Sequence, residues 1–304
     1  MMKKLSLIFV LVMSAKLLSA QKTMNLYEGK VPNSKIAADY IELADTAFAD
    51  KKIRISKVTQ PQLSAFYPDK RNGISVIICP GGGYARLAVS NEGNEIVKAL
   101  NEQGITAFVL KYRLPSDLIM EDKTIGPLQD AEQAIKLVRE HAVEWGINPD
   151  KIGIMGFSAG GHLASTLGTH YKNVVIDNPK NTNLRPDFMA LIYPVITMSA
   201  LTHQGSKNNL LGLTPSEELI KLYSNELQVN AETPSTFIVH ANDDKTVPSE
   251  NSIDFARNLK QAGVKSELHL YQAGGHGFGL NNKTTQEKWF LSFVNWLKAN
   301  KWMD

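Results

Sequence analysis

Short runs of apolar, mostly β-branched residues alternate with longer amphipathic segments from about residue 74 to the end of the chain. Six of these runs predict strands, at residues 74–79, 105–112, 151–155, 188–193, 235–241 and 266–271. Most are hydrophobic at successive positions, which is typical of parallel strands covered by helices on both faces. The alternation therefore predicts an α/β fold with a doubly wound, mostly parallel sheet.

Three helices are legible between and after these strands. Residues 127–145 place apolar side chains three and four positions apart, as one face of a helix requires. Residues 249–262 begin at a serine and stop before a glycine, which are common ends of a helix. Thr284 and Glu287 have the spacing of a capping box, which predicts that a last helix starts there.

Two parts of the chain depart from the alternation. Residues 21–73 fit it poorly and predict antiparallel edge strands at about 53–58 and 63–67. Residues 197–225 interrupt it between two strands, which predicts an inserted cap or lid. Because no internal repeat, low-complexity tract or linker is present, we expect a single domain over residues 21–304.

The first twenty residues have the organisation of a secretory signal peptide. Lys3 and Lys4 precede a short apolar stretch, and small residues end at Ala20. We predict cleavage after Ala20 and a secreted or periplasmic protein. This leader carries three lysines and no acid, so it accounts for the whole formal net charge of +3. The remaining chain has no basic run suited to nucleic acid and no later apolar run suited to a membrane helix.

The composition indicates a folded globular protein with a single cysteine. With 43% hydrophobic and 21% charged residues, the 304-residue chain has the balance of a packed globular protein rather than a disordered one. Cys79 is its only cysteine, which excludes an intramolecular disulfide. Because Cys79 ends an apolar strand-like run, we expect a small buried hydrophobic side chain there, not a reactive thiol.

The candidate chemistry starts at Ser158. Residues 156–160 read GFSAG, a G-x-S-x-G pattern between a predicted strand and a run of good helix formers. A sharp strand-to-helix turn needs small residues beside the serine because the backbone crowds itself there. Such a turn presents the hydroxyl above the sheet, and the helix N-terminus behind it favours negative charge. The pattern is common by chance, so it needs partners elsewhere in the chain.

The partners required are a base and an acid, because serine is a weak nucleophile at neutral pH. We predict that His276, in a glycine-rich loop after the last strand, is the base. Asp243 and Asp244 follow another strand, and either carboxylate is suited to accept the Nδ1–H of the imidazole. Spacing alone does not separate these two aspartates. His240, which ends the same strand, is expected to support the site only.

A glycine-rich segment supplies the remaining part of a hydrolytic site. Residues 80–84 read PGGGY and directly follow the first predicted strand. Consecutive glycines let backbone N–H groups converge on a developing oxyanion, and the N–H of Ala159 adds a further donor. No Lys-Ser or Lys-Thr pair follows, so a Walker-type phosphate loop fits poorly. Every candidate follows a predicted strand, where α/β sheets carry their active sites.

The order glycine loop, serine, aspartate and histidine resembles that of the α/β hydrolases. Within them the chain is most similar to secreted bacterial esterases and lipases, and especially to carbohydrate esterases of the acetylxylan and feruloyl kind. The resemblance implies that Asp244 is the acid, that Gly82, Gly83 and Ala159 are the oxyanion donors, and that no cofactor or metal is used. It is carried by residues 80–84, 110–115, 148–152, 156–164, 244–248 and 274–278.

Further residues enter through the same resemblance. Pro80 stands where relatives of hormone-sensitive lipase have histidine, which favours a carbohydrate esterase over a plain lipase. Tyr84 and Arg86 follow the glycines and are candidates for lining the acyl or sugar pocket. Arg113 and Asp130 are candidates for a buried ion pair that holds the oxyanion loop.

The expected protein is a metal-independent serine esterase that acts on acetylated or feruloylated fragments of plant polysaccharide. A short-chain lipase or a serine peptidase of the same fold are alternatives, although a prolyl-oligopeptidase type would need a β-propeller that these 304 residues do not contain. A hydrolase-like protein that only binds carbohydrate or another ligand is a further alternative. No member of the triad is missing, which favours the enzyme. The oligomeric state is left open.

Overall fold

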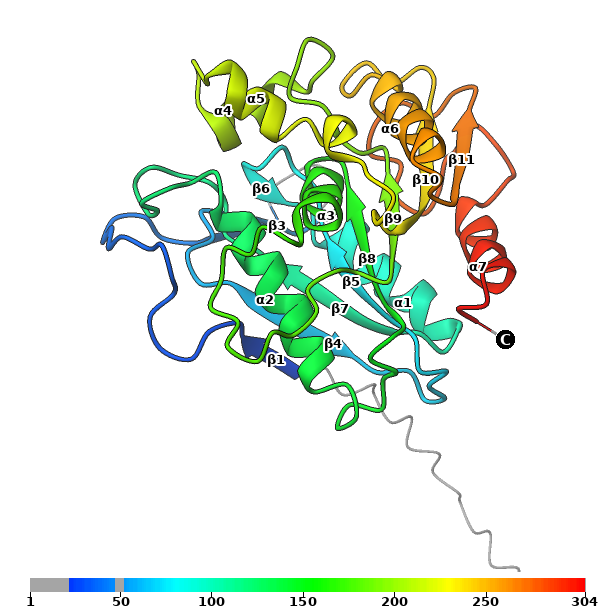
Figure 1. The fold of residues 1–304 in the computed structure, drawn as a ribbon, viewed down its shortest axis with the longest axis horizontal. Helices are drawn as coiled ribbons and strands as arrows, with labels where there is room; N and C mark the ends of the chain where they lie inside the picture. The colour runs from blue at the N-terminus through cyan, green and yellow to red at the C-terminus, as the bar shows by residue number, and fades with distance from the viewer. Residues whose placement is uncertain (1–21, 47–51, 304) are drawn as a thin grey trace, which may run out of the picture.

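The main sheet has eight strands in the order β1-β4-β7-β5-β8-β9-β10-β11. The structure is a computed structural model that describes residues 22–46 and 52–303, so the predicted signal peptide lies outside the described residues (Figure 1). The six predicted strands correspond to β5 (Ser75–Cys79), β7 (Thr106–Lys111), β8 (Ile152–Phe157), β9 (Phe188–Ile192), β10 (Ser235–Ala241) and β11 (Ser266–Tyr271). Each pairs in parallel with its neighbours in this group. The predicted α/β fold is confirmed.

The N-terminal region differs from the prediction in part. The strand expected at 63–67 is β4 (Gln62–Phe66), which is antiparallel to both β7 and β1 (Lys22–Asn25). The strand expected at 53–58 is β3 (Arg54–Ser56), which does not lie at the edge of the main sheet. It pairs instead with β2 (Leu43–Asp45) and β6 (Arg86–Leu87) in a small antiparallel sheet. This small sheet brings the N-terminal region to the residues that follow the glycine loop.

Helices cover both faces of the main sheet, as Figure 1 shows. One face carries α2 (Gly126–Glu140), α3 (Ala159–His170) and α6 (Glu250–Gln261), and the other carries α1 (Glu95–Glu102) and α7 (Trp289–Ala299). Successive side chains of β5 alternate between the two cores: Ile77 and Cys79 face one, Val76 and Ile78 the other. Strands buried on both faces read as continuous apolar runs for this reason.

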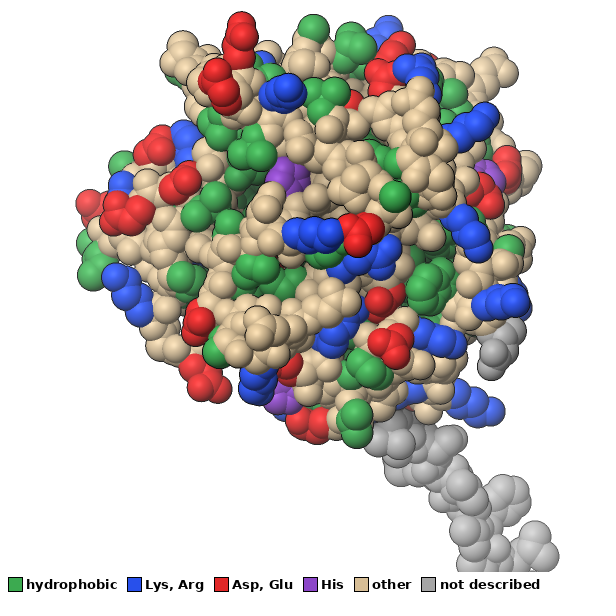
Figure 2. All heavy atoms as spheres, viewed as in Figure 1, with side chains coloured by type: hydrophobic (Ala, Val, Ile, Leu, Met, Phe, Trp, Pro, Cys, Tyr) green, Lys and Arg blue, Asp and Glu red, His purple; other side chains and the backbone are tan. Residues whose placement is uncertain are grey.

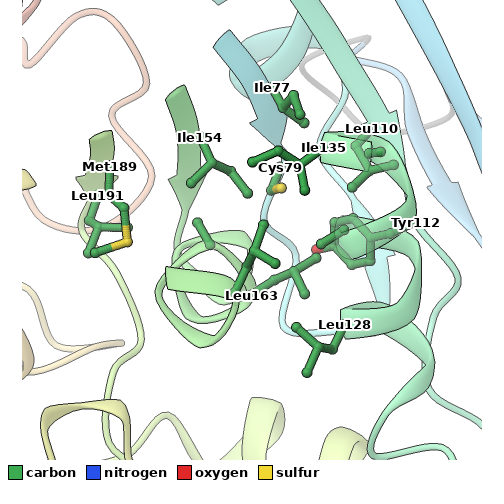
Figure 3. Close-up of a cluster of buried hydrophobic side chains, with 14 of the residues drawn as sticks. Ile77, Cys79, Leu110, Tyr112, Leu128, Ile135, Ile154, Leu163, Met189 and Leu191 are labelled. Carbon is green, nitrogen blue, oxygen red and sulfur yellow. The ribbon is translucent and has the colours of Figure 1, made fainter. Parts of the chain in front are cut away.

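Cys79 lies within the first of these cores. Figure 3 shows its sulfur among aliphatic side chains that include Ile77 and Ile135. The residue is fully buried, and burial alone raises the pKa of its thiol far above the ordinary value. The expected small buried hydrophobe is therefore what the fold contains.

Two helix ends differ from their predictions. The helix expected over 127–145 is α2, which stops at Glu140 and continues as turns. The last helix, α7, starts at Trp289 and not at Thr284. The Thr284 hydroxyl donates to the carbonyl of Ala273 at 2.8 Å, so this residue holds a loop and does not cap a helix. Tertiary hydrogen bonding has overridden a local capping pattern.

The segment expected to form a cap, residues 197–225, folds into α4 (Gln204–Leu211) and α5 (Glu217–Leu222) and runs into the short η2 (Asn225–Gln228). In Figure 1, α4 and α5 lie side by side at one margin of the molecule. The segment contacts the glycine loop because the Asn209 amide donates to the carbonyl of Gly83 at 2.8 Å.

The surface carries charges of both signs. On the face shown in Figure 2, lysine and arginine side chains are interspersed with aspartate and glutamate, with no broad region of a single sign. Within residues 22–46 and 52–303, no helix has the length and apolar character needed to span a bilayer.

Candidate active site

Ser158 lies at the sharp turn between β8 and α3, with φ of 51° and ψ of −119°. This left-handed backbone is strained for any residue with a side chain. The neighbouring positions leave no room for one: a Cβ added to Gly156 would lie 2.2 Å from the carbonyl oxygen of Gly160. A Cβ added to Gly160 would lie 2.0 Å from the carbonyl oxygen of Cys79. The turn therefore requires glycine on both sides of the serine.

The three residues expected to form the triad lie in one chain of short contacts. Ser158 Oγ is 2.8 Å from His276 Nε2, and His276 Nδ1 is 2.6 Å from Asp244 Oδ2. Asp243, the other candidate acid, accepts the N–H of Gly275 at 2.7 Å. The structure thus brings Asp244 to the imidazole and leaves Asp243 to fix the loop that carries it.

The carboxylate of Asp244 is surrounded by donors. The backbone N–H groups of Thr246 and Val247 donate to Oδ1, both at 2.9 Å, and His240 Nε2 lies 3.3 Å from Oδ2. Burial opposes ionisation, but the hydrogen bonds from His240 and His276 outweigh it and hold the pKa of Asp244 well below its usual range. The carboxylate is therefore ionised at neutral pH. His240 supports the site, as its position at the end of β10 predicted.

The glycine loop lies directly against the serine. Gly82 and Gly83, with φ of 134° and 65°, line the same cavity as Ser158. In the part of the chain that the structure describes, no acceptor engages the backbone N–H of Gly82, Gly83 or Ala159. The N–H of Gly81 is occupied, because it donates to the side chain of Glu92 at 2.7 Å. Three unengaged donors beside a serine hydroxyl have the composition of an oxyanion site.

A cavity of about 510 Å³ opens beside Ser158 and His276. The glycine loop, the small sheet, the segment 197–225 and the His276 loop all contribute to its wall. Its lining residues are Arg54, Gly82, Gly83, Ala85, Arg86, Ala88, Asn91, Glu92, Ser158, His203, Gly205, Asn209, Thr246, His276 and Gly277.

The two candidate pocket residues after the glycines lie on opposite sides of the loop. Arg86 is exposed and lines the cavity that also contains Ser158. Tyr84 does not: its side chain is only 2% exposed and its hydroxyl is 2.9 Å from His162 Nδ1, inside the core. A φ of 59° at Tyr84 turns the side chain inward, so the expectation that it lines the pocket is wrong.

His203 and Arg54 are among the cavity residues that the sequence did not predict. His203, at the start of α4, lies on the cavity wall, with Nδ1 accepting the N–H of Ser206 at 3.2 Å. Burial lowers its pKa, and the nearby His276 adds to the effect, so its imidazole is neutral at pH 7. Arg54 reaches the cavity because β3 pairs with β6, with Ser56 opposite Arg86. Both positions depend on contacts distant in sequence, and no local motif marks them.

The buried pair expected between Arg113 and Asp130 is present. Arg113 is 1% exposed, and its Nη2 lies 2.8 Å from Asp130 Oδ1. Its Nη1 donates to the carbonyl of Pro32 at 2.7 Å, so the pair joins the end of β7 to α2 and to the N-terminal region. The pair does not hold the glycine loop, contrary to expectation. The adjacent Tyr112 does so, because its hydroxyl donates to the carbonyl of Pro80 at 2.7 Å.

A Ser–His–Asp arrangement at the carboxyl ends of parallel strands, facing a glycine-rich donor loop, defines the α/β-hydrolase class. The sequence model of the BD-FAE family matches residues 64–259. The chain therefore belongs to the BD-FAE family of α/β hydrolases.

Similar proteins support this assignment. The chain is 38% identical to an acetylxylan esterase of Xylanibacter ruminicola, over 81% of this chain and 50% of that protein. It is 35% identical to endo-1,4-beta-xylanase B of Butyrivibrio fibrisolvens, over 70% of this chain and 34% of that protein. It thus spans half or less of the length of these two relatives. The chain is also similar to a solved structure, that of the acetyl ester-xyloside bifunctional hydrolase of Caldicellulosiruptor lactoaceticus. The match has a TM-score of 0.79 and 35% sequence identity, and it covers 95% of this chain and 100% of that one.

Proposed function

We propose that the protein is a serine esterase in which Ser158, His276 and Asp244 form the catalytic triad. The observation that carries this proposal is the continuous contact from Ser158 Oγ to His276 Nε2, at 2.8 Å, and from His276 Nδ1 to Asp244, at 2.6 Å. His276 removes the hydroxyl proton while Ser158 attacks the ester carbonyl carbon. Asp244 accepts the Nδ1–H and stabilises the imidazolium that forms.

The oxyanion of the tetrahedral intermediate is held by the backbone N–H groups of Gly82, Gly83 and Ala159. These donors are preorganised, so they stabilise developing charge without reorganisation, and each is worth about 3 kcal/mol in comparable sites. His276 then donates its proton to the departing alcohol, which leaves an acyl-enzyme on Ser158. A water molecule, deprotonated by His276, attacks the acyl carbon. His276 then returns this proton to Ser158 Oγ as the bond to the acyl carbon breaks and the carboxylic acid is released.

The favoured substrate is an acetylated fragment of plant polysaccharide, with feruloylated fragments as the other candidate. The support is the similarity to an acetylxylan esterase and to an acetyl ester-xyloside hydrolase. A cavity bordered by polar side chains such as Asn209 and Arg86 suits a sugar better than a long aliphatic chain. Export is part of the proposal and rests on the leader at residues 1–20, so the mature protein should begin at Gln21 when its N-terminus is sequenced.

Hydrolysis of p-nitrophenyl acetate by the wild type and by Ser158→Ala tests the mechanism. We expect the alanine variant to lose about 10⁴-fold or more of kcat with unchanged thermal stability, because it lacks the nucleophile. Undiminished hydrolysis by Ser158→Ala would refute the proposal. Release of acetate from acetylated xylan, compared with release of ferulate from methyl ferulate, then identifies the acyl group. A p-nitrophenyl ester series from acetate to octanoate tests the lipase alternative.

A further inference from the structure

A buried carboxylate lies beside the proposed oxyanion donors. Glu92, in the short π-helical segment η1 (Ser90–Asn94), is 4% exposed. Its Oε2 accepts the N–H of Gly81 at 2.7 Å, and its Oε1 accepts the hydroxyl of Tyr193 at 2.9 Å. Neither donor carries a charge. Burying a carboxylate against uncharged groups is costly, and burial raises the pKa of Glu92 although both hydrogen bonds oppose that effect.

Tyr193 continues the connection to the other side of the site. It follows β9 with φ of 38°, and its hydroxyl accepts the N–H of Gly279 at 3.1 Å. Its ring packs edge-on against the imidazole of His276, with the ring centres 5.0 Å apart. Hydrogen bonds therefore run without a break from Gly81 in the glycine loop, through Glu92 and Tyr193, to Gly279 in the loop that carries His276.

The first link of this chain determines where the oxyanion donors point. Gly81 is packed so tightly that an added Cβ would lie 2.8 Å from the Cβ of Ser158 and 2.5 Å from the carbonyl oxygen of Phe157. Its N–H is directed at Glu92, and its carbonyl accepts the N–H of Ala88 at 2.9 Å. With both polar groups of Gly81 engaged, the orientation of the peptides that follow it is fixed. Those peptides carry the unengaged N–H groups of Gly82 and Gly83.

We propose that Glu92 is a positioning residue that fixes the glycine loop and the His276 loop relative to each other through Tyr193. This inference rests on the proposed esterase function and assigns Glu92 no contact with the reacting atoms. A carboxylate is suited to this task because its two oxygens accept donors from opposite sides at once, whereas an amide offers one acceptor. Displacements of about 1 Å in a catalytic constellation cost up to about 100-fold in rate, so a residue that prevents them affects kcat.

The test compares Glu92→Gln, Tyr193→Phe and the double variant in hydrolysis of p-nitrophenyl acetate. Glu92→Gln keeps the shape of the side chain but leaves one of its two donors without an acceptor. Tyr193→Phe keeps the ring against His276 and removes only the hydroxyl. We expect each to lower kcat by about 10-fold or more with KM within about 3-fold, because the damage is to the transition-state geometry. The double variant should be no slower than the slower single one, because both break the same chain.

Glu132→Gln is the matched control. Glu132 is also a fully buried glutamate that accepts a backbone N–H, from Val175 at 2.9 Å, but it lies on α2 outside the active-site cavity. Its glutamine variant should keep wild-type kcat. Three results would each overturn the inference. The first is wild-type kcat in both Glu92→Gln and Tyr193→Phe, and the second is an equal loss of kcat in Glu132→Gln. The third is a loss of kcat in the double variant that equals the product of the two single losses. These outcomes leave the esterase proposal intact, since none of them changes the loss of hydrolysis expected in Ser158→Ala.

Discussion

His240 and His276 approach the same carboxylate oxygen of Asp244, at 3.3 Å and 2.6 Å. His240 Nε2 is also 3.0 Å from the carbonyl of Val247, and its Nδ1 is 2.7 Å from the hydroxyl of Ser252. The carbonyl requires a proton on Nε2, so His240 also presents an N–H toward Asp244. The acid of the proposed triad is thus held in place by residues of its own loop and strand, independently of His276.

Replacing Asp244 with asparagine should lower kcat by about 10⁴-fold with little change in KM. The amide cannot stabilise the imidazolium, and it favours the wrong tautomer of His276. Asp243→Asn is the matched control, because its amide oxygen still accepts the N–H of Gly275. We expect the control to keep activity within about 3-fold, since an exposed substitution that preserves its hydrogen bond has a small effect. Steady-state kinetics on p-nitrophenyl acetate compares the two, and equal losses would mean that the acid is not Asp244.

The contact between the three residues of the proposed triad was predictable because they follow strands whose ends meet. Ser158, Asp244 and His276 follow β8, β10 and β11, and parallel strands place their carboxyl ends at one edge of the sheet. The local motif around Ser158 and the strand topology together were sufficient to predict that these residues lie close to one another. Spacing did not separate Asp243 from Asp244, because adjacent residues of a loop differ only in the direction of their side chains.

The wall of the pocket was not predictable in the same way. Arg54 reaches it only because Ile55 pairs with Leu87 across more than thirty residues of sequence. His203 reaches it only because the segment 197–225 contacts the glycine loop, where the Asn209 amide donates to the carbonyl of Gly83. Tyr84 was expected in the pocket because it follows the glycines, but a positive φ directs it into the core. Tertiary packing determines which strands pair and whether φ is positive at such positions. It leaves no periodic pattern in the sequence.

Gly160→Ala should destabilise the fold by about 3 kcal/mol or more, because the new methyl group would lie 2.0 Å from the backbone oxygen of Cys79 and 2.7 Å from that of Pro80. Backbone atoms cannot rotate away, so the turn that carries Ser158 must shift and activity should fall as well. Gly93→Ala is the control: there the nearest atoms to a new methyl group are side-chain atoms of Val109 and Val89, at 3.5 and 3.8 Å, which is ordinary van der Waals contact. Urea unfolding measures both, and a Gly160→Ala variant as stable as Gly93→Ala would contradict the steric account of the motif.

Arg113→Ala should lower the free energy of unfolding by about 3–5 kcal/mol, because it leaves the fully buried Asp130 without its cation. The pair does not contact the glycine loop, so kcat of the folded variant should stay near the wild-type value. The exposed pair of Arg257 and Asp254, 2.7 Å apart, gives the comparison: Arg257→Ala should change stability by less than about 1 kcal/mol. The double variant Arg113→Met, Asp130→Leu should lose less free energy of unfolding than Arg113→Ala alone. A larger loss would contradict the buried-charge explanation.

Glu132 makes a pH-dependent contribution to stability that its glutamine variant should abolish. Burial raises the pKa of Glu132 from 4.5 to about 7, and its Oε1 has no hydrogen-bond partner. The folded state therefore holds this proton more tightly than the unfolded state. The resulting stabilisation is fully present below pH 4.5 and is lost as the pH rises through 7. At about 1.4 kcal/mol per pKa unit, the change amounts to about 3 kcal/mol.

Glutamine is uncharged throughout this range, so Glu132→Gln should gain stability relative to the wild type between pH 5 and pH 8. Its advantage should be greatest at pH 8, where the wild type buries a charged carboxylate, and it should shrink or reverse at pH 5. Urea unfolding at half-unit pH steps measures the difference, with the exposed Glu102→Gln as the control that removes a carboxyl without removing a buried charge. Parallel pH curves for wild type and Glu132→Gln would show that Glu132 does not titrate in this range, because a group that binds protons equally in both states adds no slope.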